Sequence, residues 1–366
     1  ANGSVVTWGD DDFAGDSSAV APLLTEGVVQ VSGNARAFAA IKANGSVVTW
    51  GIAGHGGDSS TVARLLTEGV VQVCGTARAF AAIKANGTVV TWGDDDFAAD
   101  SSVLLGDDDF AGTSFAVAPI LTESVVQVCG TARAFAATKV NGSVVTWAIG
   151  TMGVVQVSGT EFAFAAIKAN GSVVTWGAVR SGGDSSAVAP LLTEGVVQVC
   201  GTARAFAAIK ASGSVVTWGD ADFAGDSSAV APLLTEGVIQ VCGTTRSFAA
   251  IKAKGSVVTW GNADHGGDSS TVAPLLTEGV VQVCGTARAF AAIKANGSVV
   301  TWGNAASGGD SFAVASLLAD GVVQISGTNF AFAAIKANGS VVTWGNADYG
   351  GDSSTVASLL ADGVVQ

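Results

Sequence analysis

The sequence predicts an all-β fold, a β-propeller built of repeated three-stranded antiparallel blades with a short linking helix in each repeat. The first observation is the word VVTW, which recurs every 42 residues apart from one spacing of 55 and one of 29. The second is an Asn-Gly pair between two short apolar segments in most copies. The third is that these segments are apolar on both faces. VVTW contains all the tryptophans: Trp8, Trp50, Trp92, Trp147, Trp176, Trp218, Trp260, Trp302 and Trp344.

Residues 28–51 illustrate the three strands of one repeat. The β-branched segment VVQVSG predicts a first strand that ends at Gly33. The second and third strands, in RAFAAIKA and SVVTWG, flank Asn44-Gly45. Asn-Gly between apolar segments is typical of a type I′ turn, so these strands should pair antiparallel. The Val doublets place apolar side chains on both faces, which predicts strands buried on both sides.

Residues 56–69, GGDSSTVARLLTEG, predict the linking helix. Asp58 or Ser59 can cap its N-terminus. Val62, Leu65 and Leu66 have the spacing of an apolar helical stripe, and Gly69 suits the position after its end. Both spacing exceptions fall in this linker, which indicates that it is exposed.

A three-stranded sheet that is apolar on both faces has to stack on further copies of itself. Stacking around an axis gives a propeller, and a linear β-solenoid is the alternative; the antiparallel hairpin in every copy favours the propeller. Eight copies are complete, from Val28 to Trp344, and a ninth is split between the two ends. We therefore expect one domain, residues 1–366, with seven to nine blades; whether the array is an excerpt of a longer one stays open.

Composition limits the partners. Asp and Glu outnumber Lys and Arg by 30 to 17, for a net charge of -13, so nucleic acid and anionic membranes should be repelled. No apolar run approaches the length that spans a bilayer. A protein is the expected partner.

Residues with reactive side chains are few. Five cysteines share one repeat position with serines, which predicts free structural thiols at a small buried site: Cys74, Cys129, Cys200, Cys242 and Cys284. His55 and His265 share a loop position with Phe13, Phe223 and Tyr349, which indicates a packing or surface role rather than catalysis. Without a nucleophile, a base and a group to orient them, we expect neither an enzyme nor a cofactor.

The acidic loops, residues 10–16, 94–100 and 220–226, could hold Ca²⁺ through their carboxylates. They lack the glycine turn and closing Glu of an EF-hand loop, so we expect solvated loops and no metal site. The arginine of the word TARAF, such as Arg78, or of its counterpart NARAF, Arg36, could form a charged ring on one face. Equally, these arginines and the Lys42-type lysines could pair with the Glu of LLTEG or extend along the surface.

The order VVQVCG, an Ala-rich strand, then NGSVVTWG and a Gly-containing loop resembles the regulator of chromosome condensation repeat family. The likeness is greatest to its short-repeat bacterial relatives, which include propeller-type β-lactamase inhibitory proteins. The resemblance covers the whole chain and implies a propeller, typically of seven blades. The family's His before the Ala-rich strand is absent here, with Arg36 or Ala37 nearest to it. The photoreceptor motif and the nucleotide-exchange wedge of some members are also absent, so those activities do not carry over.

The function that we expect is a non-enzymatic protein–protein interaction scaffold that uses the loops of one propeller face. The loops after each Trp vary most, and the segment 94–112 is enlarged by thirteen residues. Exposed aromatic anchors among carboxylates there suit a basic or mixed-charge protein surface. A structural or assembly subunit of a larger complex is the alternative. The candidate partner-binding residues are Phe97, Phe110, Asp94, Asp95, Asp96, Asp107, Asp108 and Asp109.

Overall fold

The computed structural model describes residues 3–9, 15–94, 125–131, 135–140, 144–146, 150–151, 154–357 and 359–360. It divides the chain into two compact units, residues 2–179 (the N-terminal unit) and residues 180–366 (the C-terminal unit). Each unit is a run of propeller blades, and each is described by itself. The predicted all-β propeller fold is confirmed, and the described residues contain eight antiparallel sheets, within the predicted range of seven to nine.

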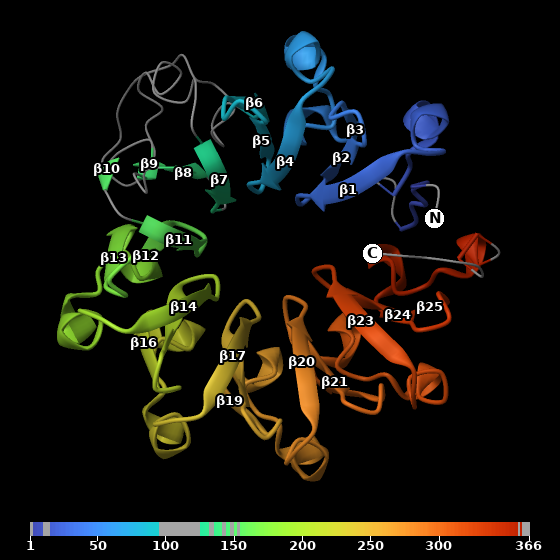
Figure 1. The fold of residues 1–366 in the computed structure, drawn as a ribbon. Helices are drawn as coiled ribbons and strands as arrows, with labels where there is room; N and C mark the ends of the chain where they lie inside the picture. Colours follow the sequence, from blue (N-terminus) through green and yellow to red (C-terminus); the bar gives the residue numbers. More distant parts are fainter. Residues whose placement is uncertain are drawn as a thin grey trace. The chain divides into compact units, whose positions relative to one another are not determined.

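The C-terminal unit has four blades of three strands, each joined in the order first, second, third (Figure 1). Consecutive first strands contact one another along the unit. The blades are β14 (Val196–Gly201), β15 (Ala205–Lys210) and β16 (Val215–Gly219); β17 (Val238–Gly243), β18 (Ser247–Lys252) and β19 (Val257–Gly261); β20 (Val280–Gly285), β21 (Ala289–Lys294) and β22 (Val299–Gly303); β23 (Val322–Gly327), β24 (Ala331–Lys336) and β25 (Val341–Gly345).

The N-terminal unit repeats this pattern, and its third sheet has a fourth short strand. Its blades are β1 (Val28–Gly33), β2 (Ala37–Lys42) and β3 (Val47–Gly51); β4 (Val70–Gly75), β5 (Ala79–Lys84) and β6 (Val89–Gly93); β7 (Val125–Gly130), β8 (Phe135–Lys139), β9 (Val144–Thr146) and β10 (Gly150–Thr151); β11 (Val154–Gly159), β12 (Ala163–Lys168) and β13 (Val173–Gly177).

The hairpin between the second and third strands pairs as predicted, with Ala39 opposite Thr49. Its turn is not of type I′, however. Gly45 has a φ of 76°, whereas no described Asn in these hairpins has a positive φ. The amide of Gly45 donates to the carbonyl of Lys42 at 2.7 Å, which closes a four-residue turn followed by a left-handed glycine. That is the three-residue hairpin loop, in which only the glycine needs a positive φ.

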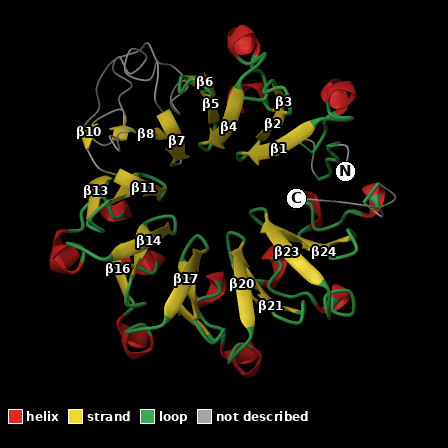
Figure 2. Ribbon diagram, in the orientation of Figure 1, coloured by secondary structure: helices red, strands yellow, loops and turns green. Residues whose placement is uncertain are grey.

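The linkers contain 3₁₀ helices (Figure 2). A three-residue turn follows most third strands, and a second 3₁₀ helix then covers the third strand of the next blade. The turns are η3 (Ala53–His55), η6 (Val179–Ser181), η8 (Ala221–Phe223), η10 (Ala263–His265), η12 (Ala305–Ser307) and η14 (Ala347–Tyr349). The covering helices are η2 (Ser18–Leu23), η4 (Ser60–Leu65), η7 (Ser186–Leu191), η9 (Ser228–Leu233), η11 (Ser270–Leu275) and η13 (Phe312–Val314); η15 (Ser354–Val356) follows the last described blade.

The covering helix η4 differs from the predicted amphipathic stripe. Leu66, which follows the last residue of η4, is buried at 3% exposure, but Leu65 is 52% exposed, so Val62, Leu65 and Leu66 do not form one buried stripe. The carboxylate of Asp58 accepts the amide of Ser60 at 2.8 Å, while the hydroxyl of Ser59 bonds to Thr49. Asp58 is therefore the residue that turns the chain into the helix.

Adjacent blades pack through opposite faces of their second and third strands. Ala249 and Ile251 of one blade pack against Phe290 and Trp302 of the next. In each such blade the Phe and Trp rings stack, with centroids 5.2–5.4 Å apart. Burial of the equivalent tryptophans, predicted from their recurrence, is confirmed for Trp176 at 9% and Trp260 at 4% exposure.

The indole N–H groups tie blades together. The Nε1 of Trp302 donates to the carbonyl of Gly266, the residue that ends η10 of the preceding blade, at 3.0 Å. Trp92, Trp218 and Trp344 make the same bond at 3.0 Å. In these blades the turn after the preceding third strand is therefore fixed by the next blade.

The first strands are less buried than predicted. The second residue of each is exposed, as in Val71 at 57%, because a bulge beside this residue turns its side chain away from the neighbouring blades. The prediction that every strand is buried on both faces is wrong for this position.

The five cysteines also lie in first strands; they are free and half-buried. Burial raises the pKa of Cys200 to about 11 and that of Cys129 to about 12.

Candidate interaction surface

One end of every blade carries both variable loops. First and third strands run towards this end and second strands run away from it, so the turn between the first two strands meets the turn that follows the third. In the C-terminal unit we call this end the arginine rim. It is defined by Arg204, Arg246, Arg288 and Phe330 in the former turns and by Phe223, His265, Ser307 and Tyr349 in the latter.

The backbone of the arginine rim is held by a repeated set of hydrogen bonds. Within a blade, the hydroxyl of Thr244 donates to the carbonyl of His265 at 3.0 Å. Between blades, the amide of Ala203 donates to the carbonyl of Thr245 at 3.0 Å, and the amide of Thr245 donates to Ala287 at 3.0 Å. These bonds join the backbones of the turns that carry neighbouring arginines.

Phe223 lies between two arginines. The guanidinium carbon of Arg204 is 4.9 Å from the ring centroid, and that of Arg246, in the next blade, is 4.5 Å away. Phe223 is 8% exposed. Both distances are within the range of a cation–π interaction, so the ring fixes two arginines by their faces.

His265 takes the same place one blade further on, between Arg246 and Arg288. Burial lowers the pKa of His265, and the charges of Arg288 and Arg246 lower it further, against a smaller opposite effect of Asp264. Its Nδ1 lies 3.0 Å from the side-chain oxygen of Asn262. The imidazole is therefore neutral near pH 7 and acts as a polar ring between two cations.

The alternating row of guanidinium groups and rings changes towards the end of the unit. Ser307 replaces the ring after Arg288, and Phe330 replaces the next arginine. Phe330 meets Tyr349 edge to face, with centroids 4.6 Å apart. A packing or surface role was predicted for the His, Phe and Tyr position; Phe223 and His265 are both buried, which is the packing role. Their contacts with arginine were not predicted, because the partners are 19 and 23 residues apart and partly in different blades.

The opposite end of the blades uses its cations differently. The amine of Lys294 donates to the carbonyl of Leu275 at 2.9 Å, and the other repeat lysines that bond in this way are Lys42, Lys84, Lys210, Lys252 and Lys336. Pairing of such a lysine with an acid in the linker occurs at Lys336, whose amine is 3.3 Å from Asp320. These lysines therefore hold the linkers.

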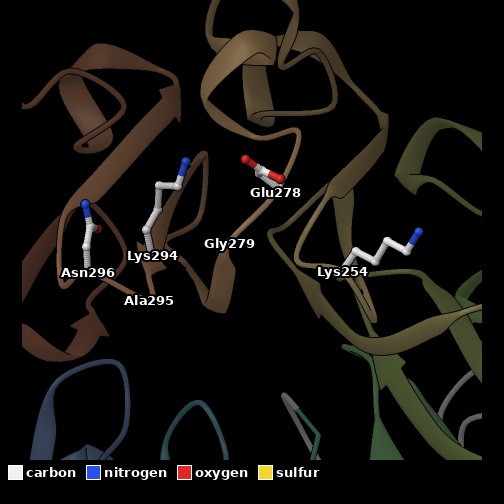
Figure 3. A pocket seen from close by; sticks show the side chains of 6 residues that line it. All are labelled: Lys254, Glu278, Gly279, Lys294, Ala295 and Asn296. Carbon is white, nitrogen blue, oxygen red and sulfur yellow. The ribbon is translucent and has the colours of Figure 1, made fainter.

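A shallow hollow at this opposite end is lined by Lys254, Glu278, Gly279, Lys294, Ala295 and Asn296 (Figure 3). Figure 3 shows Lys254 on a separate loop from Lys294 and Asn296. The amine of Lys294 is already bonded to the linker, and Lys254 is exposed. The hollow has no buried polar group that would specify a ligand.

Of the candidate binding residues in the segment 94–112, Asp94 is described. Its carboxylate forms an ion pair with Arg78 at 3.4 Å, at the end of the blade that carries the variable loops. Asp95, Asp96, Phe97, Asp107, Asp108, Asp109 and Phe110 lie outside the described residues. The described counterpart of Phe97 is Phe223, which packs between arginines.

The acidic loop 220–226 uses its carboxylates as local caps. Asp220 accepts the amide of Asp222 at 3.0 Å, and Asp226 accepts the amide of Ser228 at 2.8 Å. Within the described part of the chain, no three His, Cys, Asp or Glu side chains are grouped to hold a metal ion. Among the described helices, none has the length and apolar character to cross a membrane.

No protein-family model and no curated protein sequence matches the chain. Several solved structures are similar. Prp20p from Saccharomyces cerevisiae has 13% identity and a TM-score of 0.46, over 82% of this chain and 82% of that one. The CRINKLY WD40 ectodomain of the Arabidopsis thaliana receptor kinase ACR4 has 14% identity and a TM-score of 0.40, over 74% and 92%. The computationally designed Ika8 protein has 10% identity and a TM-score of 0.41, over 94% and 99%. Membership of the regulator of chromosome condensation repeat family remains a prediction.

Proposed function

We propose that the chain is a non-enzymatic protein–protein interaction scaffold and that the arginine rim is the face that binds its partner. The observation that carries this proposal is the row Arg204, Phe223, Arg246, His265, Arg288. The Phe223 ring holds the guanidinium groups of Arg204 and Arg246 by their faces, and the N–H donors of a guanidinium lie along its edge. Arg288 is exposed and Arg246 is half-buried, so their edges are within reach of a partner.

The rim also indicates the chemistry of the partner. A guanidinium edge pairs best with the two oxygens of a carboxylate. Asp222 and Asp264, in the turns beside the arginines, are exposed and add negative charge. The complementary partner is a protein surface that carries acidic residues opposite the arginines and basic residues opposite these two aspartates. The chain's net charge of -13 further disfavours nucleic acid as the ligand of this rim.

Variation among the repeats agrees with this assignment. The turn after the third strand contains Phe223, His265, Ser307 or Tyr349 at the same position, whereas the lysines of the opposite end recur and bind linker carbonyls. A surface that recognises one specific partner needs different side chains in successive blades. A position that only makes a structural hydrogen bond can carry the same residue in every blade.

Two substitutions of equal charge test the proposal. Arg288→Gln and Lys254→Gln each remove one positive charge from an exposed side chain, the first at the arginine rim and the second at the opposite end. Each variant and the unchanged chain would be used to capture proteins from native extract, with quantitative mass spectrometry of what is retained. We expect Arg288→Gln to lose partners that Lys254→Gln retains.

Equal retention by both variants would refute the role of the arginine rim and favour the alternative, a structural or assembly subunit. The partner-binding role predicted for segment 94–112 is tested in the same assay with Phe97→Ala and Phe110→Ala together. Loss of capture at unchanged thermal stability would support that role, and unfolding of the double variant would place the two rings in the core.

A further inference from the structure

The hairpin turns between second and third strands combine an asparagine with a hydroxyl residue two positions later. The triplet Asn-Gly-Ser or Asn-Gly-Thr occurs in five described turns, at Asn44, Asn86, Asn170, Asn296 and Asn338. Asn2 and Asn141 begin the same triplet in the sequence and lie outside the described residues. Asn-x-Ser/Thr, where x is not proline, is the acceptor motif for N-linked oligosaccharide.

The asparagines of these turns can be reached from solvent. All five described ones are exposed, at the end of the blade opposite the variable loops. Asn296 also lines the shallow hollow at this end (Figure 3). An enzyme that modifies a side chain has to reach it, and an exposed hairpin turn meets this requirement.

Hydrogen bonds within the turn use the oxygen of the carboxamide. In the first blade, the Oδ1 of Asn44 accepts the amide of Ser46 at 3.0 Å and its hydroxyl at 2.8 Å. The same two bonds hold the asparagine in the other four described turns. Among the described groups, none accepts a hydrogen bond from the Nδ2 of Asn44. A sugar on Nδ2 would therefore leave both bonds of the turn intact.

Two blades of the C-terminal unit show that the hairpin forms without the asparagine, because Ser212 and Lys254 take its place. The amide of Gly255 still donates to the carbonyl of Lys252 at 2.7 Å, and the amide of Lys252 donates to the carbonyl of Ser256 at 2.8 Å. Both blades have complete three-stranded sheets. Closure of the hairpin alone therefore does not explain why the other turns keep both an asparagine and a hydroxyl.

The asparagines of the chain differ between the two ends of the blades. Every asparagine that precedes a glycine begins the acceptor motif. The asparagines at the end that carries the variable loops do not begin it: Asn34, Asn262, Asn304, Asn329 and Asn346. Oligosaccharides are bulky and hydrophilic, so they would cover the hairpin turns and leave the arginine rim free.

We propose that the asparagines of the hairpin turns are acceptor sites for N-linked oligosaccharide. An oligosaccharyltransferase would join Nδ2 to the anomeric carbon of a lipid-diphosphate-linked oligosaccharide. The bond from this carbon to the diphosphate breaks, the lipid diphosphate leaves, and a proton passes from Nδ2 to a base of the enzyme. The sites are independent of the arginine rim.

This reaction places the chain in a secretory compartment during its synthesis. The five cysteines are free, and they are compatible with such a compartment. Burial raises the pKa of thiols such as that of Cys200, which slows their oxidation.

The test directs the 366-residue chain into the secretory pathway of a eukaryotic cell with a cleavable signal peptide. Peptide N-glycosidase converts a glycosylated asparagine to aspartate, and in heavy-oxygen water it marks each occupied site for mass spectrometry. Occupancy is measured on chain from the medium and from the cells, so poor secretion does not hide the result. Two variants are matched: Ser46→Ala removes the hydroxyl of the motif at Asn44, and Ser214→Ala removes the equivalent hydroxyl from a turn without asparagine. A third variant, Lys254→Asn, completes the motif in a blade that lacks it.

We expect sugar at the five described asparagines, loss at Asn44 alone in Ser46→Ala, and an unchanged pattern in Ser214→Ala. Lys254→Asn should gain a sugar at position 254, and it keeps the test decisive if Ser46→Ala folds poorly. The thermal midpoint should be the same before and after removal of the sugars, because the turns keep their hydrogen bonds. A chain without sugar at these asparagines, or occupancy at Asn44 that survives Ser46→Ala, would overturn the proposal. Neither result bears on partner capture by the arginine rim.

Discussion

Ala224 lies where the other described linkers have glycine, and its replacement by glycine should stabilise the C-terminal unit. It ends η8 with a φ of 70°, and it is the one described non-glycine residue with a positive φ. At the same position Gly266 has a φ of 88°. A Cβ on Gly266 would lie 2.6 Å from a ring carbon of Phe290, so the methyl group of Ala224 occupies space next to Phe248.

The structure shows what this methyl group displaces. The rings of Phe248 and Trp260 are inclined at 34°, against 21–27° in the other described pairs. The Nε1 of Trp260 is 3.2 Å from the carbonyl of Ala224, against 3.0 Å from Trp302 to Gly266. Left-handed backbone costs alanine about 1–2 kcal/mol. Glycine also raises the conformational entropy of the unfolded chain, which lowers the free energy of unfolding by about 0.4–1 kcal/mol. Ala224→Gly should therefore raise the free energy of unfolding by about 1 kcal/mol net.

Thermal unfolding followed by circular dichroism would measure this gain. We expect the midpoint of Ala224→Gly to rise by about 2–4 °C, the shift for 1 kcal/mol in a unit of this size. Gly266→Ala is the reverse control and should lower the midpoint, since it adds both the strained φ and the contact with Phe290. If Gly266→Ala is as stable as the unchanged chain, or Ala224→Gly is less stable, the reasoning from backbone strain and ring displacement fails.

Three further predictions concern the core and its titrating groups. Trp302→Phe should cost about 2–3 kcal/mol in urea unfolding because it removes a buried hydrogen bond. Trp50→Phe should cost about 1 kcal/mol less, since the Nε1 of Trp50 has no hydrogen-bond partner among the described residues; equal costs would contradict this. Burial raises the pKa of Cys200 from an ordinary value of 9.0 to about 11. Its thiol should therefore react slowly with a thiol reagent at pH 8 until the chain unfolds, and stability should fall as pH rises above 9, less so in Cys200→Ser; rapid native reaction would refute this. Burial lowers the pKa of His265 from 6.5, so protonation favours the unfolded chain and the thermal midpoint should fall as pH drops below 6.5. His265→Phe, which copies Phe223, should weaken that dependence, and an unchanged dependence would refute the assignment.

The strands could be predicted because each is specified locally. The β-branched words and the Asn-Gly pair fix three strands and their antiparallel order within about 24 residues, as β1 to β3 show. The turn type was mistaken because Asn-Gly fits both the two-residue loop and the three-residue loop, and the strand register decides between them. The linking helix was predicted in place, but its 3₁₀ geometry was not, and Leu65 was wrongly assigned to the buried stripe.

The candidate surface was predictable only in outline. Variation after each tryptophan indicates the end of the blade that carries the rim. Contacts such as that of Arg246 with Phe223 join residues of neighbouring blades. A sequence pattern within one repeat does not show which residues of neighbouring blades lie close together.

Hydrogen–deuterium exchange of the chain with its captured partner bound tests the proposed interaction face most directly. We expect partner binding to slow exchange in the turns at 202–204, 244–246 and 286–288 and to leave the hairpin turns at 253–256 and 295–298 unchanged. Protection of the hairpin turns, with no change at the arginine turns, would contradict it.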